Sequence, residues 1–238
     1  MIVVDLFGQS ANYPLLTPIA KNYGLKTISD AAQSFGTTLN GQSPCNWVDI
    51  MTTSFFPAKP LGCYGDGGAV FTNNKTLYDS IDSLRIHGRG TDKYDNVSIG
   101  LNSRLDTLQA AILLEKLRIF PDELLKRNAI AKIYCEGLKS NSIKKPFIQS
   151  GITSSWAQFT IEVDNPDRLA DKLSKLGIPT ARYYPRPTHL QTAYTNYPSD
   201  PNGLPHTVAA MRRVISLPMH AYLDETTQSK IIDAISTL

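Results

Sequence analysis

Long apolar runs are absent from this sequence of 238 residues. No segment approaches the ~20 consecutive apolar residues that a membrane-spanning helix needs. The N-terminal stretch MIVVDLFGQSANY is apolar only briefly and reaches a charge at Asp5, so it lacks the pattern of a signal peptide. The sequence therefore predicts no membrane partner, and the expected location is the cytoplasm.

Cysteine is scarce as well. Cys45, Cys63 and Cys135 are scattered and odd in number, which argues against a disulfide framework and fits a reducing compartment. Neither they nor the four histidines have the spacing of metal ligands, so no metal site is predicted. The net charge of +3 is small, and no basic run is interleaved with aromatic residues. A nucleic-acid partner is therefore not expected.

The first half of the chain alternates strand-like and helix-like segments. Strands are expected over residues 1–8, 25–29, 48–56 and 67–73, with helices over 14–23, 75–85 and 103–117. The first strand, the first helix and the second strand read as a βαβ unit, so these strands should be parallel. The sheet opens directly on a strand and has few segments, which makes it incomplete for a doubly wound α/β domain.

A helix over residues 121–138 is expected to lead into a smaller α+β domain. Pro121 suits a first helical position. The segments that follow are predicted strands over 155–163 and 178–184 and predicted helices over 167–177, 205–213 and 224–237. The predicted organisation is a partial large domain over 1–120, followed by the connector helix and a small C-terminal domain over 121–238.

Lys59 stands in an unusual setting, the stretch SFFPAKPLG. The flanking prolines restrict the backbone and remove amide donors, and two phenylalanines lead into the stretch from a strand end. A solvated loop lysine is the common alternative. A desolvated lysine, however, has a lowered pKa, and its free amine can attack a carbonyl to form a Schiff base. Lys59 is therefore a candidate nucleophile.

Asp30 and Gln33 lie in ISDAAQSFG, directly after an expected buried strand. Ligands of open α/β sheets bind beyond the carboxyl ends of the strands, so the Asp30 carboxylate can face a ligand there. Gln33 lies one turn further on and can reach the same ligand. The alternative is that Asp30 merely caps a helix starting at Ala31, which is a frequent use of aspartate.

Asn102, Ser103 and Arg104 precede an expected helix in GLNSRLDTLQAAIL. A helix N-terminus favours an anion, and Arg104 can add a bidentate contact with a carboxylate or phosphate. An ordinary cap with a solvated arginine explains the same pattern, and the local sequence does not separate the two. The turn CYGDGGAVF lacks GxGxxG spacing and leads into a strand, so its glycines are expected to serve the turn itself.

These segments occur together in the order of a known family. GQSANY, DAAQSFG, SFFPAKPLGCYGDGGAVFTN, RIHG and NSRLDTLQAAILLEKL resemble the DegT/DnrJ/EryC1/StrS family of sugar aminotransferases, over nearly the whole chain. The resemblance implies an enzyme that uses pyridoxal 5'-phosphate (PLP) and has the aspartate aminotransferase fold, which is PLP-dependent transferase fold type I. The expected architecture is α/β, with a mainly parallel sheet in an incomplete large domain and a small C-terminal α+β domain.

The resemblance assigns five residues to the cofactor, four of them in the site of the chain's own subunit. Lys59 would bind PLP covalently and later move protons as the base. Asp30 would pair with the ring nitrogen, Gln33 would contact the ring face or its 3-oxygen, and Ser54 would bind the phosphate.

Three further residues are assigned by the same resemblance. Asn102 would reach the phosphate in the neighbouring subunit's site, because the family builds its sites across a homodimer. Arg104 would lie near a sugar carboxylate, which suits its planar fork. Tyr184 would touch the sugar nucleotide. Related chains often carry histidine where Tyr183 stands, and this departure bears on which sugar is bound.

The implied reaction transfers an amino group from L-glutamate to the keto group of a nucleotide-linked sugar. KPLGCYGDGGA and SLPMHAYLD look closest to the branch that aminates UDP-2-acetamido-2-deoxy-3-oxo-glucuronic acid, for bacterial surface polysaccharide such as O-antigen. Dehydratases of the family have histidine in place of the lysine, so Lys59 favours transamination.

By this comparison, much of the N-terminal part of a typical family member is missing. That part holds the helix start that cradles the cofactor phosphate, and an aromatic residue that stacks on the ring. We therefore expect this chain alone to bind PLP weakly and not to transaminate. The alternative function is a truncated, non-catalytic remnant that retains the dimerisation surface. A plain nucleotide-binding α/β domain is disfavoured because no phosphate loop is found.

Overall fold

The computed structural model describes residues 1–236, which divide into two compact units. The first unit consists of Met1–Leu125 and Ile148–Ala157, and the second of Lys126–Phe147 and the described residues from Gln158 onward. The boundary between these units lies within a helix rather than at residue 120, and residues 148–157 return to the first unit. How functional domains divide the chain stays a prediction.

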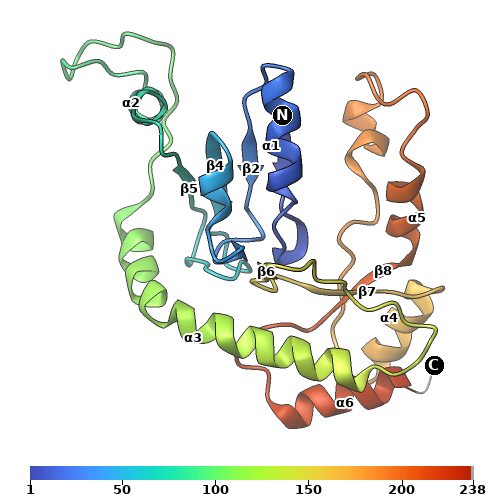
Figure 1. The fold of residues 1–238 in the computed structure, drawn as a ribbon. Coiled ribbons are helices and arrows are strands. Elements are labelled where there is room, and N and C mark those ends of the chain that lie inside the picture. The colour runs from blue at the N-terminus through green and yellow to red at the C-terminus, as the bar shows by residue number, and fades with distance from the viewer. Residues whose placement is uncertain (237–238) are drawn as a thin grey trace. The chain divides into compact units, whose positions relative to one another are not determined.

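A four-stranded sheet organises the first unit (Figure 1). Its strands, in spatial order, are β1 (Ile2–Val4), β2 (Ile28–Asp30), β4 (Ile50–Ser54) and β5 (Gly68–Phe71). The β1–β2 and β2–β4 pairs are parallel and the β4–β5 pair is antiparallel, so the predicted βαβ unit and mainly parallel sheet are confirmed. A separate antiparallel pair joins β3 (Thr38–Leu39) to β6 (Ile152–Thr153).

Helices link these strands much as the sequence predicts. The elements are η1 (Leu6–Gly8), α1 (Tyr13–Asn22), η2 (Pro44–Trp47) and α2 (Lys75–Leu84), where η denotes a 3-10 helix. α1 has a proline in its first turn, a position that needs no amide donor, and it buries Tyr13 and Ala20. α2 begins at Asn74, whose side-chain oxygen accepts a hydrogen bond from Leu77 N–H at 3.1 Å.

One continuous helix, α3 (Thr107–Gly137), replaces the two helices expected over 103–117 and 121–138. It starts after Asp106 rather than Ser103, and the Asp106 carboxylate accepts a hydrogen bond from Leu108 N–H at 2.8 Å. Pro121 lies inside the helix, so the predicted break was wrong. A proline within a helix costs about 3 kcal/mol. We attribute its tolerance here to the neighbouring Phe120, which is buried in an aromatic core.

The second unit contains the antiparallel pair β7 (Phe159–Glu162) and β8 (Val214–Leu217). Its remaining elements are the C-terminal part of α3, α4 (Pro166–Lys175), η3 (Thr188–Leu190), η4 (Thr192–Tyr194), α5 (Pro205–Arg213) and α6 (Glu225–Ser236). Of the helices formed by residues 1–236, none combines the length and the apolar character that a membrane crossing requires.

The strand expected over 178–184 was wrong, because that segment forms one isolated bridge, between Ala181 and Ser216. Ile178 N–H is used to end α4, where it donates to Leu173 O at 2.9 Å, and Pro179 has no N–H to offer a sheet. A strand that was not predicted, β8, pairs with β7.

An aromatic cluster forms the core of the first unit beside the sheet. Its buried members are Phe55, Leu61, Cys63, Leu113 and Phe120. Phe35 packs against this cluster, with its ring centroid 5.9 Å from that of Phe71 and 5.7 Å from that of Phe120. The cluster therefore joins β5, α3 and the segment that follows β4.

Burial alternates along all four strands of the sheet. The register aligns Val3, Ser29, Met51 and Phe71 in one row, and Val4, Asp30, Thr52 and Val70 in the next. Side chains of adjacent rows point to opposite faces of a sheet. The first row is on the face of the aromatic cluster, and the second row is on the less buried face.

The fold is predicted to require glycine at position 8, the last residue of η1, because a side chain there would clash with the backbone. Its φ is +100°, and an added Cβ would lie 2.6 Å from Trp156 N. Gly8→Ala should lower the free energy of unfolding by about 1–3 kcal/mol more than Gly24→Ala does. Gly24 is the matched control, since its φ is +63° and an added Cβ meets nothing within 4 Å. Urea unfolding measures both variants, and equal losses would contradict the close packing at Gly8.

Candidate active site

Two predicted site residues meet at the carboxyl ends of neighbouring parallel strands. Asp30 is the last residue of β2, and Ser54 is the last residue of β4. The register pairs Asp30 with Thr52, two residues before Ser54, so the Asp30 and Ser54 side chains share one face of the sheet. The parallel arrangement thus places a carboxylate and a hydroxyl at the edge where ligands of α/β sheets bind.

Lys59 follows β4 in a turn that the aromatic cluster holds. Cys63 N–H donates to Phe55 O at 2.8 Å, and Lys59 N–H donates to Phe56 O at 2.9 Å. Phe55, Leu61 and Cys63 are buried, so both ends of the turn are fixed in the core. The half-buried Lys59 side chain is therefore presented from a rigid support.

The Lys59 amine is electrostatically coupled to Asp30. Burial lowers the pKa of Lys59 below its ordinary value, and the negative charge of Asp30 partly offsets this effect. Among residues 1–236, the amine has no hydrogen-bond partner, so it is available for a ligand. Asp30 Oδ1 accepts from Ala32 N–H at 3.1 Å, but no helix starts at Ala31, because residues 32–36 form turns; the carboxylate therefore holds a turn and does not cap a helix.

Gln33 is buried and braces the loop that follows β1. Its Oε1 accepts a hydrogen bond from Phe7 N–H at 2.7 Å, and its backbone oxygen accepts from Ser155 Oγ at 3.2 Å. The side-chain oxygen is therefore committed to the fold. The predicted contact of Gln33 with a cofactor stays a prediction.

A buried carboxylate that was not predicted from the sequence, Asp5, adjoins Asp30. Asp5 N–H donates to Asp30 O at 3.0 Å. Four donors contact the Asp5 carboxylate: Ala11 N–H, Tyr13 OH and Ser29 OH at 2.8 Å each, and Ser34 OH at 3.4 Å. Burial nevertheless raises the pKa of Asp5. The pattern that could have identified Asp5 is a single acidic residue at the end of an apolar strand, which is also the pattern at Asp30.

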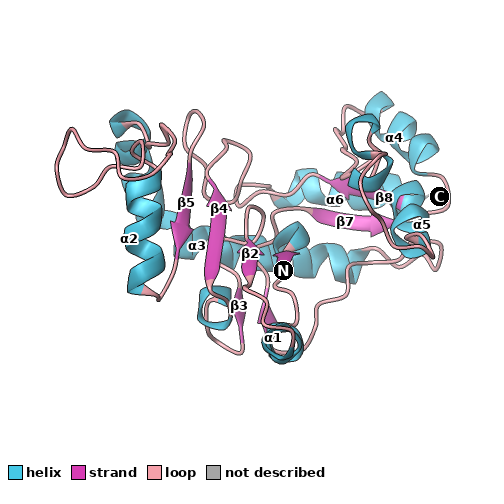
Figure 2. Ribbon diagram, turned by 90° about the horizontal axis from the view of Figure 1, so that it is seen from above, coloured by secondary structure: helices cyan, strands magenta, loops and turns pink. Residues whose placement is uncertain are grey.

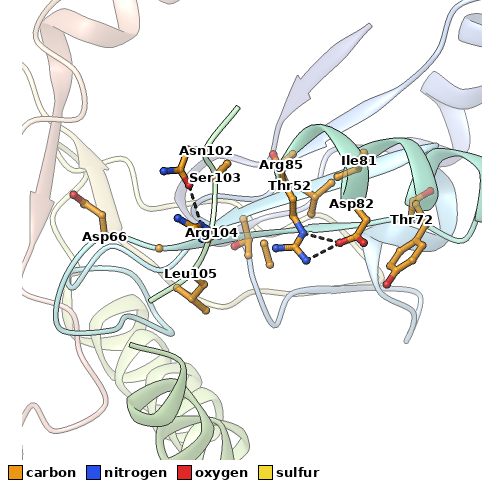
Figure 3. A pocket seen from close by; sticks show the side chains of 16 residues that line it. Thr52, Asp66, Thr72, Ile81, Asp82, Arg85, Asn102, Ser103, Arg104 and Leu105 are labelled. Carbon is orange, nitrogen blue, oxygen red and sulfur yellow. Dashed lines mark hydrogen bonds and ion pairs between the residues drawn. The ribbon is translucent and has the colours of Figure 1, made fainter. Parts of the chain in front are cut away.

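Asn102 and Arg104 lie together on an exposed segment, where Arg104 Nε donates to Asn102 Oδ1 at 2.9 Å. They line a hollow of about 740 Å³ whose walls come from β4, β5 and α2. Figure 3 shows this pair at one side of the hollow. Lys59, Asp30 and Ser54 do not line it. The structure thus separates Asn102 and Arg104, which line the hollow, from the residues at the ends of β2 and β4. Thr52 connects the two groups, because it lines the hollow and pairs with Asp30 in the sheet.

Tyr184 belongs to the second unit, where it is 51% exposed. Its ring makes an edge contact with that of Tyr183, at a centroid separation of 5.4 Å. Its contact with a sugar nucleotide stays a prediction, as do the roles assigned to the other six residues.

Comparisons with known sequences place this arrangement in context. The profile of the DegT/DnrJ/EryC1/StrS aminotransferase family matches residues 1–236. The UDP-2-acetamido-2-deoxy-3-oxo-D-glucuronate aminotransferase of Pseudomonas aeruginosa is 45% identical over 237 residues, covering 100% of this chain and 65% of the relative. A dTDP-3-amino-3,4,6-trideoxy-alpha-D-glucose transaminase of Streptomyces venezuelae is 34% identical, covering 99% and 62%. The chain thus spans less than two thirds of the length of these relatives.

Solved structures confirm the predicted fold class for the part that the chain covers. A DegT DnrJ EryC1 StrS aminotransferase from Brucella abortus is similar with a TM-score of 0.96 and 50% sequence identity, over 99% of this chain and 63% of that protein. NtdA from Bacillus subtilis, solved with bound cofactor PMP, is similar with a TM-score of 0.85 and 29% identity, over 98% and 55%.

Replacing Asp5 should change how stability depends on pH. Burial raises the pKa of Asp5 above its ordinary value of 3.8, so the folded state favours the protonated carboxyl. The contribution of Asp5 to the free energy of unfolding is therefore largest at low pH and is lost as pH rises through the folded-state pKa. The stability of the wild type minus that of Asp5→Asn should therefore fall with rising pH, by about 1.36 kcal/mol for each unit of pKa difference. Urea unfolding over a pH series measures this, and a difference that is constant or rises with pH would contradict the burial effect.

Removing the Asp30 charge should lower the pKa of Lys59 further, because that charge is what offsets burial. An amine reagent labels only the neutral form of Lys59, so its labelling rate rises with pH. In Asp30→Asn, the pH at which this rate reaches half of its maximum should be lower than in the wild type. Mass spectrometry of the Lys59 peptide gives this midpoint. Asp66→Asn, which removes an exposed carboxylate from the same unit, is the control and should leave the midpoint in place. An unchanged midpoint in Asp30→Asn would rule out the coupling.

Proposed function

The chain belongs to the DegT/DnrJ/EryC1/StrS aminotransferase family, and we propose that it takes part in PLP-dependent transfer of an amino group to a keto group of a nucleotide-linked sugar. The observation that carries this proposal is the half-buried Lys59 amine, which is electrostatically coupled to Asp30 at the carboxyl end of β2. Similarity to NtdA, which was solved with PMP, supports the cofactor.

The groups at this edge fit PLP chemically. A primary amine without a hydrogen-bond partner can bond covalently to an aldehyde, a carboxylate can pair with a protonated ring nitrogen, and a hydroxyl can donate to a phosphate. Asp30 and Ser54 supply the carboxylate and the hydroxyl at one edge of the sheet, and Lys59, which is electrostatically coupled to Asp30, supplies the amine from the turn after β4. Of the proposed cofactor residues, Gln33 has the least support, because its side-chain oxygen already accepts from Phe7.

Bound PLP supplies an electron sink that lets an amino group leave a donor and enter a keto sugar. Lys59 has two tasks in this proposal, to hold the cofactor and to move a proton at Nζ. Both need the neutral amine, and the lowered pKa of Lys59 increases its neutral fraction. The negative charge of Asp30 favours a protonated ring nitrogen, which is the form that withdraws electrons.

Asn102 and Arg104 are proposed to act in the site of a second subunit. They stand on an exposed segment whose apolar neighbours Ile99 and Leu101 are 100% and 70% exposed, as expected for a surface that a partner covers. The planar guanidinium of Arg104 suits a sugar carboxylate. Tyr184 is proposed to contact the sugar nucleotide from the second unit. We therefore propose a homodimer with shared sites.

The proposed acceptor is UDP-2-acetamido-2-deoxy-3-oxo-glucuronate, and the proposed amino donor is L-glutamate. The reaction is proposed to take place in the cytoplasm and to supply a sugar for bacterial surface polysaccharide. The P. aeruginosa relative named for this sugar is 45% identical, against 34% for the S. venezuelae relative named for a dTDP sugar. Arg104 agrees with a uronic acid because it offers a partner for the carboxylate.

Borohydride trapping tests the central residue. With saturating PLP, reduction should leave a phosphopyridoxyl group on the Lys59 peptide of the wild type. Lys59→Ala should lose this label, and Lys75→Ala, which removes an exposed lysine paired with Asp79, should keep it. Labelling that survives Lys59→Ala would refute the assignment. No labelling of the wild type would favour the alternative, a non-catalytic remnant.

A further inference from the structure

One side of helix α3 holds the turn that carries Lys59. Gln109, Leu113, Lys116 and Phe120 recur at intervals of four, three and four residues, so their side chains lie on the same side of the helix. Leu113 and Phe120 are buried in the aromatic cluster, and Figure 2 shows α3 passing beside β4 and β5. The other two members, Gln109 and Lys116, are polar, and both bind the backbone of the turn.

Gln109 fixes the end of the turn. Its Oε1 accepts a hydrogen bond from Tyr64 N–H at 2.8 Å, although the two residues lie far apart in the sequence. The contact is close, since a Cβ added to Gly65 would lie 3.2 Å from Gln109 Nε2. The backbone at residues 64 and 65 is therefore tied directly to α3.

Lys116 fixes the same turn nearer to Lys59. Its Nζ donates a hydrogen bond to Gly62 O, and it lies 5.8 Å from the centroid of the Tyr64 ring, within the range of a cation–π contact. Within residues 1–236 Lys116 forms no ion pair, so its charge serves these two contacts. A hydrogen bond from a charged donor is stronger than one between neutral groups.

The turn itself leaves little freedom around Gly62. That residue is buried, and a Cβ added to it would lie 2.6 Å from both Phe56 O and Pro57 O. The two arms of the turn thus pack directly against each other, with Lys59 between them. Because the Lys59 amine has no hydrogen-bond partner of its own among residues 1–236, its place depends on the backbone that carries it.

We propose that Gln109 and Lys116 are positioning residues for Lys59. By tying its turn to α3, they keep the amine half-buried and within reach of the Asp30 charge. They act through the backbone of the turn and do not touch a ligand. This role deepens the proposed function and rests on it, because that function needs a Lys59 amine held at one place in its neutral form.

A looser turn should raise the pKa of Lys59. Burial has the larger effect on this pKa and lowers it, while the charge of Asp30 raises it. Exposure of the amine to water removes the larger effect, so the pKa moves back toward its ordinary value. The charges that shift this pKa do not include Lys116, so replacement of Lys116 should act through the turn.

The test measures the labelling rate of Lys59 by an amine reagent over a pH series, in the full chain without PLP. Gln109→Met and Lys116→Met should each raise the pH of half-maximal rate. At a pH well below this midpoint, labelling should be at least about threefold slower, which corresponds to about half a pKa unit. Asp30→Asn should then shift the midpoint less in either variant than in the wild type. Lys116→Arg keeps a charged donor and should keep the wild-type midpoint.

Two controls separate positioning from general effects. Lys132→Met removes an exposed lysine from the same helix and should leave the midpoint unchanged. Ala20→Gly lowers the free energy of unfolding through α1, where Ala20 is 1% exposed, and it should leave the midpoint unchanged as well. Urea unfolding checks that each variant is folded at the pH values used.

Three results overturn the proposal. They are unchanged midpoints in both methionine variants at 109 and 116, a rise in Lys116→Met alone, which reports the lost charge, and an equal rise in Ala20→Gly, which reports a general loss of stability. Borohydride trapping with PLP separates the two proposals. Unchanged midpoints with Lys59 trapped remove the positioning role alone, and raised midpoints without trapping in the wild type remove the proposed function alone.

Discussion

The alternation of side chains across β1, β2, β4 and β5 is the constraint on which the first unit depends. One row, from Val3 to Phe71, is packed on the side of the aromatic cluster, so the next row must point the other way. That row contains Asp30. The residues that hold the fold together and those proposed to do chemistry are thus separated by the pleat of the sheet. A shift of register by one residue would bury Asp30 in the core and expose Ser29.

The same division explains how Lys59 can be reactive without weakening the core. Phe55, Leu61 and Cys63 anchor its turn on the packed side, while the amine is left half-buried and without a hydrogen-bond partner. Asp5 gives a second support, because its carboxylate accepts from Ser29, the residue before Asp30. The positions of Lys59 and Asp30 therefore follow from the buried residues that hold their neighbours in sequence.

Much of this arrangement could be predicted from local pattern. The strand that ends at Asp30, the parallel βαβ unit and the rigid turn around Lys59 all follow from short segments. What could not be predicted depended on distant contacts. The continuity of α3 through Pro121 needs the packing of Phe120, and residues 178–184 make a single bridge, from Ala181 to Ser216, instead of the expected strand. Likewise, alternation shows that a strand has two faces but not which face is buried, so the difference in burial between the two faces became visible only in the fold.

The central claim is that Lys59 is the residue through which this chain is proposed to take part in amino transfer. Transfer of ¹⁵N from labelled L-glutamate to UDP-2-acetamido-2-deoxy-3-oxo-glucuronate, followed by mass spectrometry, tests it most directly. We expect transfer when the chain is combined with the complementary part of the P. aeruginosa relative. None is expected with either piece alone, or with Lys59→Ala in the combined sample. Equal transfer by the chain alone, or transfer that persists in Lys59→Ala, would contradict the claim.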